Sequence, residues 1–289
     1  MKTKSMCLDW RSYMKIVTDT AGLFSPAQGR ALDLRVVPAC VIIDDRVYRD
    51  YEDLQPEVYL QMLKEGAVVS TSQPAIGDLI DVFEEDEEET LGIFIGDGLS
   101  GGYQNAMGAK NSIDENERIR VIDSKTLAGA EHYLVEKAMC LRNAGMNLKD
   151  LEAELLKTVE TSVSFVIPAD FEFLKRSGRL TPLAAKLGAM IKIVPVLTQT
   201  KDWKKITPFT IKRSWKKATD AILNQLESLG VDEGYRIYIC HSGDLKNANL
   251  VLCQAKQRFP KVEMILMSLS PTMITHGGPG CVLLQAIKK

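Results

Sequence analysis

Short apolar runs alternate with helical spacings through the first half of the chain. Runs rich in apolar and β-branched residues predict strands at 15–18, 35–43, 91–95 and 118–122. Between them, apolar spacing predicts helices at 56–65 and 76–83, and the second leads into the acidic stretch 84–89. Strands that alternate with helices favour a parallel sheet covered by helices on both faces.

Two consecutive helices are predicted before the middle of the chain. The first has apolar residues on one face, namely Leu127, Ala130, Leu134, Ala138 and Leu141. Gly145 is suited to end this helix, and Asn147 is the expected N-cap of the next one.

The second half begins with a predicted strand at 165–167 and a helix at 183–190. A hairpin, a helix and a strand–helix–strand unit follow at 194–211, 214–229 and 235–267, and a final short helix is expected after the glycine-rich loop 275–280. We therefore predict two α/β domains. Residues 14–163 form an N-terminal domain with a Rossmann-like parallel sheet, residues 164–289 form a C-terminal domain with a mixed sheet, and 1–13 are an extension.

Length and composition agree with this division. The chain has 289 residues, more than one core usually contains, and its formal net charge of -2 favours no nucleic-acid partner. No apolar run approaches the roughly 20 residues of a membrane span, and no secretory signal is evident, so a cytoplasmic protein is expected. The six cysteines show neither a CxxC pair nor zinc spacing, which predicts free thiols, no metal site and no cofactor.

Three loops at predicted strand ends carry polar residues in front of helices. They contain Thr71 and Ser72, then Ser100 and Gly101, and then the segment 123–126. Ligands of open α/β sheets bind beyond the carboxyl ends of the strands, where helix N-termini favour anions. Three such loops that converge predict an anion-binding site.

An alternative reading is a serine hydrolase. The segment 98–102 matches the G-x-S-x-G nucleophile elbow in a strand–turn–helix setting, with Ser100 as the nucleophile. Asp123 or Asp170, followed by His276, completes the chain order of an α/β-hydrolase triad. This reading requires Ser100 Oγ to lie within hydrogen-bond reach of His276, with a carboxylate behind the imidazole.

Two groups of basic residues each allow a functional and a structural interpretation. Arg179 follows a turn and is suited to clamp a carboxylate, although an exposed surface charge is the favoured interpretation when this residue is taken alone. A basic stretch between 201 and 217 contains Trp203 and Trp215, a combination that binds single-stranded nucleic acid in some proteins. A solvated face or a protein-docking patch is the favoured reading of that stretch.

Taken together, the motifs resemble those of the DegV family of bacterial fatty-acid-binding proteins, some of which are the fatty-acid-binding subunit of a fatty acid kinase. The resemblance runs from about residue 15 to the C-terminus. It rests on the segments 16–19, 71–74, 99–104, 122–126, 173–179 and 275–280 in this order.

The resemblance implies a two-domain DegV-like fold that buries one long-chain fatty acid, such as palmitate, in an apolar tunnel. It implies that hydroxyl groups hold the carboxylate and that the basic pair Arg179 and His276 lies beside it. The chain would not be an enzyme. It would present the fatty acid to an ATP-dependent kinase, which forms an acyl phosphate for phospholipid metabolism. The expected ligand-binding residues are Thr71, Ser72, Ser100, Gly101, Arg179, Thr275 and His276.

Further expectations concern the tunnel and its entrance. The apolar lining of the tunnel is assigned to Leu183, Ala184, Leu187, Met190 and Ile191. The protein is expected to be a monomer. Three positions near the second loop depart from the family pattern: Gly96-Asp97 stands where the family usually has two serines, and Gly102 stands where it has a threonine. Asp97 would repel a bound carboxylate unless its side chain turns away.

Overall fold

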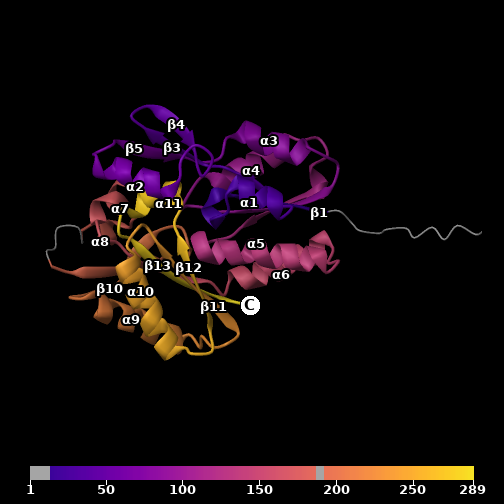
Figure 1. Cartoon of the computed structure of the whole chain (residues 1–289). Coiled ribbons are helices and arrows are strands. Elements are labelled where there is room, and N and C mark those ends of the chain that lie inside the picture. The colour runs from indigo at the N-terminus through magenta and orange to yellow at the C-terminus, as the bar shows by residue number, and fades with distance from the viewer. Residues whose placement is uncertain (1–13, 187–191) are drawn as a thin grey trace, which may run out of the picture.

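The computed structural model describes residues 14–186 and 192–289. Its first sheet has four parallel strands in the order β2 (Arg35–Val37), β1 (Met14–Asp19), β6 (Glu89–Phe94) and β7 (Ile119–Asp123). Helices cover both faces of this sheet, as expected (Figure 1). One face contacts α3 (Ile76–Glu84) and α4 (Gly102–Asn111), and the other contacts α5 (Ala128–Asn143) and α6 (Leu148–Val159).

The second sheet is mixed and has six strands in the order β10-β9-β8-β13-β11-β12. Only β11 and β12 run parallel among its neighbouring strands. The strands are β8 (Val163–Ile167), β9 (Val194–Gln199), β10 (Ile206–Lys212), β11 (Tyr235–His241), β12 (Glu263–Ser268) and β13 (Val282–Lys288). Its outer face is covered by α9 (Trp215–Ser228) and α10 (Leu245–Arg258).

Helix α5 lies between the two sheets and contacts strands of both. Its position requires a very close approach, because a Cβ atom on Gly129 would lie 2.3 Å from Cβ of Tyr238 on β11. The largest cluster of buried apolar side chains surrounds this helix and includes residues of both sheets, such as Ile16, Leu134 and Leu283. The hydrophobic core is therefore continuous from one sheet to the other.

A third, antiparallel sheet corrects one prediction. The segment 35–43 is not a single strand, because Pro38 has no N–H group to continue a sheet ladder. Its first part is β2, and its second part pairs with two further strands in the order β4-β3-β5. These strands are β3 (Cys40–Ile43), β4 (Arg46–Arg49) and β5 (Val69–Ser72).

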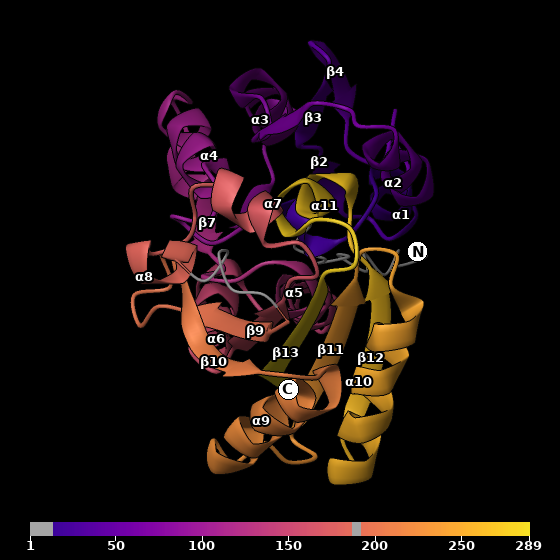
Figure 2. The ribbon, with the colours of Figure 1, turned by 90° about the vertical axis from the view of Figure 1, so that its left-hand side faces the viewer.

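Short helices close the gap between this third sheet and the second sheet. Helix α11 (Pro271–Gly277) contacts β3, β5, α2 (Pro56–Lys64) and α7 (Phe171–Arg176), and Figure 2 shows it in the centre of the molecule beside α7. The predicted final helix is wrong, because the glycine-rich loop leads into strand β13. Of the helix predicted at 183–190, the structure has α8 (Pro182–Ala185), and 187–190 lie outside the described residues.

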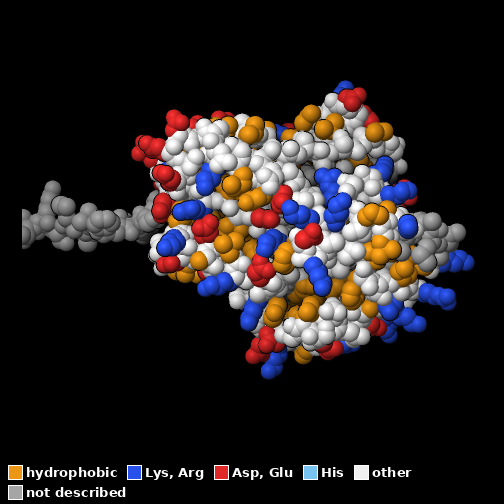
Figure 3. Space-filling view, turned by 180° about the vertical axis from the view of Figure 1, so that it is seen from behind, with side chains coloured by type: hydrophobic (Ala, Val, Ile, Leu, Met, Phe, Trp, Pro, Cys, Tyr) orange, Lys and Arg blue, Asp and Glu red, His pale blue; other side chains and the backbone are white. Residues whose placement is uncertain are grey.

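Charged side chains are distributed unevenly over the surface. Figure 3 shows acidic side chains gathered at one end of the molecule and basic side chains at the opposite end. The acidic stretch follows α3, and two of its carboxylates form ion pairs with buried or half-buried cations. Arg35 binds Glu85 at 2.7 Å, and Lys15 binds Asp86 at 2.9 Å. Part of this stretch is therefore tied to the first sheet.

The close approach at Gly129 predicts a sensitive position. We expect Gly129→Ala to lower the free energy of unfolding by about 1–3 kcal/mol, because the added methyl group collides with Tyr238. Gly77→Ala on α3 is the matched control, since no atom lies within 4 Å of its added Cβ. That change should stabilise the protein by about 0.5–1 kcal/mol. Urea unfolding measures both, and equal effects would contradict the packing argument.

Candidate functional site

Five of the predicted site residues lie around one small pocket. Thr71 and Ser72 end strand β5, Ser100 lies in the loop before α4, Arg179 follows α7, and His276 lies on α11. These residues come from four separate stretches of the sequence. We call the space that they line the polar pocket.

Helix α11 determines where His276 lies. The hydroxyl of Ser270 caps this helix by accepting a hydrogen bond from Met273 N at 3.3 Å. His276 is therefore in a helix, and the expectation that it belongs to a glycine-rich loop is wrong. Its Nε2 atom lies 2.9 Å from Thr71 Oγ1, which joins α11 to the end of β5.

His276 is neutral near pH 7. Burial and the positive charge of Arg179 lower the pKa of His276 to about 4. A neutral imidazole nitrogen either donates to or accepts from a hydroxyl group, so His276 orients Thr71 without adding charge. Of the basic pair, Arg179 alone therefore brings a positive charge to the polar pocket near pH 7.

The guanidinium group of Arg179 is half-buried and holds the Ser100 loop in place. Its Nε donates to Leu99 O at 3.0 Å, and another of its N–H groups donates to Ser177 O. A guanidinium group has five N–H donors, so further donors remain for a ligand. Arg179 is thus not the exposed surface charge that the sequence alone also allowed.

The geometry does not assemble a hydrolase triad. His276 Nε2 bonds to Thr71 instead of Ser100. The Asp123 carboxylate accepts from Lys125 N in its own loop and from Asp97 N in the loop before α4, and Asp170 caps α7. Among the described residues, no ion pair joins a carboxylate to His276, and the charge that acts on it is the positive charge of Arg179.

Two further predicted ligand-binding residues do not line the polar pocket. The Thr275 hydroxyl is buried, lies 2.7 Å from Tyr59 Oη and donates to Pro271 O at 2.9 Å. Gly101 packs against the side chain of Gln73, which itself lines the pocket. The structure thus places Thr275 and Gly101 in the surroundings of the pocket.

The departure at Asp97 does not bring a negative charge into the pocket. Its carboxylate faces Lys204 on the β9–β10 hairpin, with Oδ2 at 3.2 Å from Nζ, and accepts from Gln104 Nε2 at 3.2 Å. Asp97 does not line the polar pocket, as a bound anion would require.

One acidic residue of the pocket wall was not among the predicted site residues. Asp19 ends β1, is 1% exposed and lines the polar pocket with Ser100 and Arg179. Its Oδ1 accepts from Ala21 N at 2.9 Å, whereas Oδ2 has no partner. A possible signal was an acidic residue directly after an apolar strand, at the sheet edge where ligands bind.

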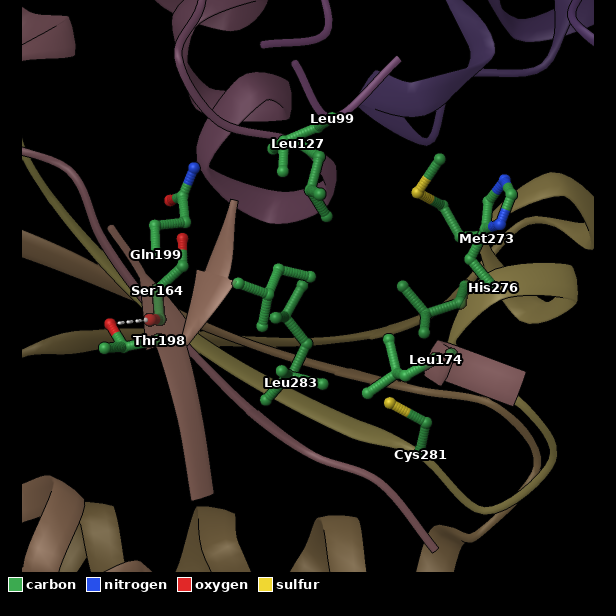
Figure 4. Close-up of a pocket in the computed structure, with 14 residues that line it drawn as sticks. Leu99, Leu127, Ser164, Leu174, Thr198, Gln199, Met273, His276, Cys281 and Leu283 are labelled. Carbon is green, nitrogen blue, oxygen red and sulfur yellow. Dashed lines mark hydrogen bonds between the residues drawn. The ribbon is translucent and has the colours of Figure 1, made fainter. Parts of the chain in front are cut away.

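An apolar cavity adjoins the polar pocket. Leu99, Met273 and His276 line both, so the two spaces meet at these residues. The cavity has about 640 Å³ of space that no protein atom fills, part of it open to solvent. Figure 4 shows its lining, which comes from strands of the second sheet and from α5, α7 and α11: Leu127, Ser164, Val166, Leu174, Thr198, Gln199, Ile206, Leu269, Gly277, Cys281 and Leu283.

Two of the five residues predicted to line the tunnel do not line this cavity. Leu183 is 64% exposed and points away from the core, and Ala184 is buried in the core without lining the cavity. Leu187, Met190 and Ile191 lie outside the described residues. The helical spacing of these five residues did not indicate which strands would form the cavity walls.

The aromatic residues of the basic stretch are engaged with the protein. Lys125 Nζ lies 4.4 Å from the centroid of Trp203, and Trp215 packs against the core under α9. Neither ring is a free stacking platform, which single-stranded nucleic acid would need.

The fold and the site define an α/β protein in which an apolar cavity meets a pocket of hydroxyl and basic groups. Comparison with known proteins agrees with this class. The profile of the DegV family, described as an uncharacterised protein family, matches residues 13–289. The chain belongs to the DegV family.

Relatives and solved structures support the assignment. The DegV domain-containing protein YteA of Lactococcus lactis is 30% identical over 285 residues, covering 95% of this chain and 98% of the relative. A structure described as fatty acid binding of a DegV family protein from Thermus thermophilus has a TM-score of 0.87 at 28% identity, covering 96% and 99% of the two chains. DegV of Bacillus subtilis, described as a fatty acid binding protein, has a TM-score of 0.83 at 25% identity over 96% and 99%.

The described helices include none that is both long and apolar enough to span a bilayer.

The charge of Arg179 predicts a measurable effect on His276. We expect Arg179→Met to raise the pKa of His276 above about 4, because the change removes a nearby positive charge. NMR titration of the imidazole signals measures this pKa. Arg176→Met is the matched control, since Arg176 is exposed and stacks on Phe173. An unchanged His276 pKa in Arg179→Met would show that burial alone lowers it.

Proposed function

We propose that this protein binds one long-chain fatty acid, with the carboxylate in the polar pocket and the hydrocarbon chain in the apolar cavity. The observation that carries the proposal is the junction of the two spaces at Leu99, Met273 and His276. A fatty acid has the same division into one charged end and one long apolar end. The descriptions of the Thermus thermophilus and Bacillus subtilis structures as fatty acid binding support it.

The cavity supplies the main favourable free energy. A sixteen-carbon chain buries about 14 methylene groups at roughly 0.8 kcal/mol each, a gross gain on the order of 11 kcal/mol. Part of this gain is offset by the loss of translational freedom and chain flexibility on binding. The remainder is compatible with tight binding of palmitate.

The polar pocket solves the harder problem of burying a carboxylate. An ionised carboxylate without partners costs several kcal/mol in an apolar setting. The hydroxyl groups of Thr71, Ser72 and Ser100 are donors on one side of this pocket, and Arg179 supplies the countercharge. His276 holds Thr71 so that its hydroxyl faces the ligand.

The same arrangement suggests presentation to a partner. We propose that Arg179 and His276 mark the side from which an ATP-dependent fatty acid kinase reaches the carboxylate and forms an acyl phosphate. This chain would then be a monomeric, non-catalytic subunit in the cytoplasm, where ATP is available. Formation of acyl phosphate by the purified chain and ATP alone would contradict this division of roles.

Filling the cavity should abolish binding. We expect Leu283→Trp to lose the fatty acid, because the larger ring occupies space that the acyl chain needs. Leu183→Trp is the matched control, since Leu183 is exposed, and it should keep one fatty acid per chain. Native mass spectrometry after addition of palmitate measures the stoichiometry. Retention of palmitate by Leu283→Trp would place the acyl chain elsewhere.

Ser100 should contribute to affinity and not to hydrolysis. We expect Ser100→Ala to weaken palmitate binding by about tenfold or more, since a hydrogen bond to a charged group is worth about 1.5–3 kcal/mol. Ser112→Ala, at the exposed end of α4, should bind as the wild type does. Titration calorimetry gives the affinities. Labelling of wild-type Ser100 by a fluorophosphonate probe would instead support the hydrolase.

A further inference from the structure

Asp19 in the wall of the polar pocket meets a second acidic side chain, Glu131, which lies behind it and does not line the pocket. Asp19 and Glu131 are 1% and 0% exposed, and their carboxyl groups act directly on each other. Glu131 comes from α5, which reaches this place because it lies between the two sheets. Apart from the interaction between the two carboxyl groups themselves, Asp19 Oδ2 and both Glu131 oxygens have no hydrogen-bond partner. Buried polar atoms are usually paired, so this arrangement calls for an explanation.

The groups around this pair set its charge. Glu131 faces Asp19 from α5, and Asp50 and Asp123 act on the pair from the ends of β4 and β7. Arg179 and the neutral His276 line the pocket on its other side. Near the pair there are thus several acids, while across the pocket there is one positive charge.

Glycine at position 102 contributes to the unpartnered state of Asp19. A Cβ atom on Gly102 would lie 2.8 Å from Asp19 Oδ2, so the carboxyl group occupies the space of a side chain there.

Counting charges shows what a bound carboxylate requires. If Asp19 is ionised, the ligand and Asp19 together place two negative charges against the single charge of Arg179. If Asp19 is neutral, the negative charge of the ligand faces the positive charge of Arg179, and the two charges balance. This balance matters because an uncompensated charge is costly in a site with little water. A neutral carboxyl group also offers an O–H donor, which an ionised one lacks.

We propose that binding of the fatty-acid carboxylate is coupled to proton uptake by Asp19, so that the ligand is held only while Asp19 is neutral. This inference rests on the proposed function and adds a positioning residue to it. The proton moves from solvent to an Asp19 oxygen as the ligand enters, and no covalent bond to the ligand forms or breaks.

The titration behaviour of the pair agrees with this geometry. Burial raises the pKa of Asp19 to about 7, and burial together with Asp19 raises the pKa of Glu131 well above its ordinary value. Near pH 7, Asp19 is therefore partly ionised in the free protein. A bound carboxylate raises the pKa of Asp19 further, so binding takes up a proton. Affinity should fall as the pH rises above about 7, by up to tenfold per pH unit.

Titration calorimetry with palmitate, in two buffers of different ionisation enthalpy, measures the number of protons taken up. At about pH 8, where Asp19 is mostly ionised in the free protein, we expect wild type to take up close to one proton more than Asp19→Asn. The proton balance of palmitate itself cancels in this difference. The affinity of Asp19→Asn should also depend less on pH than that of wild type.

Asp50→Asn is the matched control, because Asp50 is equally buried but does not line the polar pocket. The charge of Asp50 raises the pKa of Asp19, so Asp50→Asn should move the onset of proton uptake to lower pH but still take up protons at about pH 8. A loss of uptake equal to that of Asp19→Asn would overturn the assignment. If Asp19→Asn does not fold, the wild-type protein is measured alone. The absence of net proton uptake on palmitate binding between about pH 7 and 8.5 would then overturn the proposal.

The same measurements distinguish a failure of the proton coupling from a failure of fatty-acid binding. Equal proton uptake by wild type and Asp19→Asn, with both binding palmitate, overturns the proton coupling and leaves the proposed function intact. Failure of wild type to bind palmitate at any pH overturns both.

Discussion

The position of α5 between the two sheets is the constraint on which the rest of the structure depends. A single buried side chain, Gln285 of β13, fixes the start of this helix. Its amide Nε2 donates to Leu127 O at 2.9 Å and to Ser164 Oγ at 2.8 Å, and its Oε1 accepts from Ala130 N at 3.2 Å. Buried polar groups that are fully paired specify one arrangement, because any shift leaves them unsatisfied.

Several features of the site follow from this arrangement. Because α5 is shared by both sheets, Leu127 at its start reaches the apolar cavity, and Glu131 one turn later reaches Asp19 at the end of β1. The close contact of Gly129 with Tyr238 keeps the helix against the second sheet. The helix thereby connects the wall of the cavity with the wall of the polar pocket.

The polar pocket shows how a chain with few special residues is able to bury an anion. Each of its groups is ordinary alone: a hydroxyl at a strand end, an arginine after a turn, a histidine on a short helix. Placed together, they provide donors and one positive charge where water is largely absent. The departures of this chain from the family pattern fit the same requirement, because Asp97 turns to Lys204 and leaves the pocket free of its charge.

The sequence by itself determined the elements and the residue types of the site. Periods of apolar residues predicted the strands of the parallel sheet and helices α5 and α6, since local spacing reports which face is buried. The residues Thr71, Ser72, Ser100, Arg179 and His276 were chosen from loops and motifs, and the structure brings all five together. Whether they hold a ligand, and whether the domain boundary lies at 163, remain predictions.

The tertiary structure decided everything that depends on contacts between distant segments. Pro38 divides one apolar run between two sheets. Among the described residues, the cavity is lined by residues of β8, β9, β13 and α11, and neither Leu183 nor Ala184 is part of the lining. The pairing of Asp19 with Glu131, over a hundred positions apart, likewise has no local pattern. The spacing of apolar residues indicates which face of a helix or strand is buried. Whether a charged group is buried, or a cavity is left in the core, depends on which segments pack together.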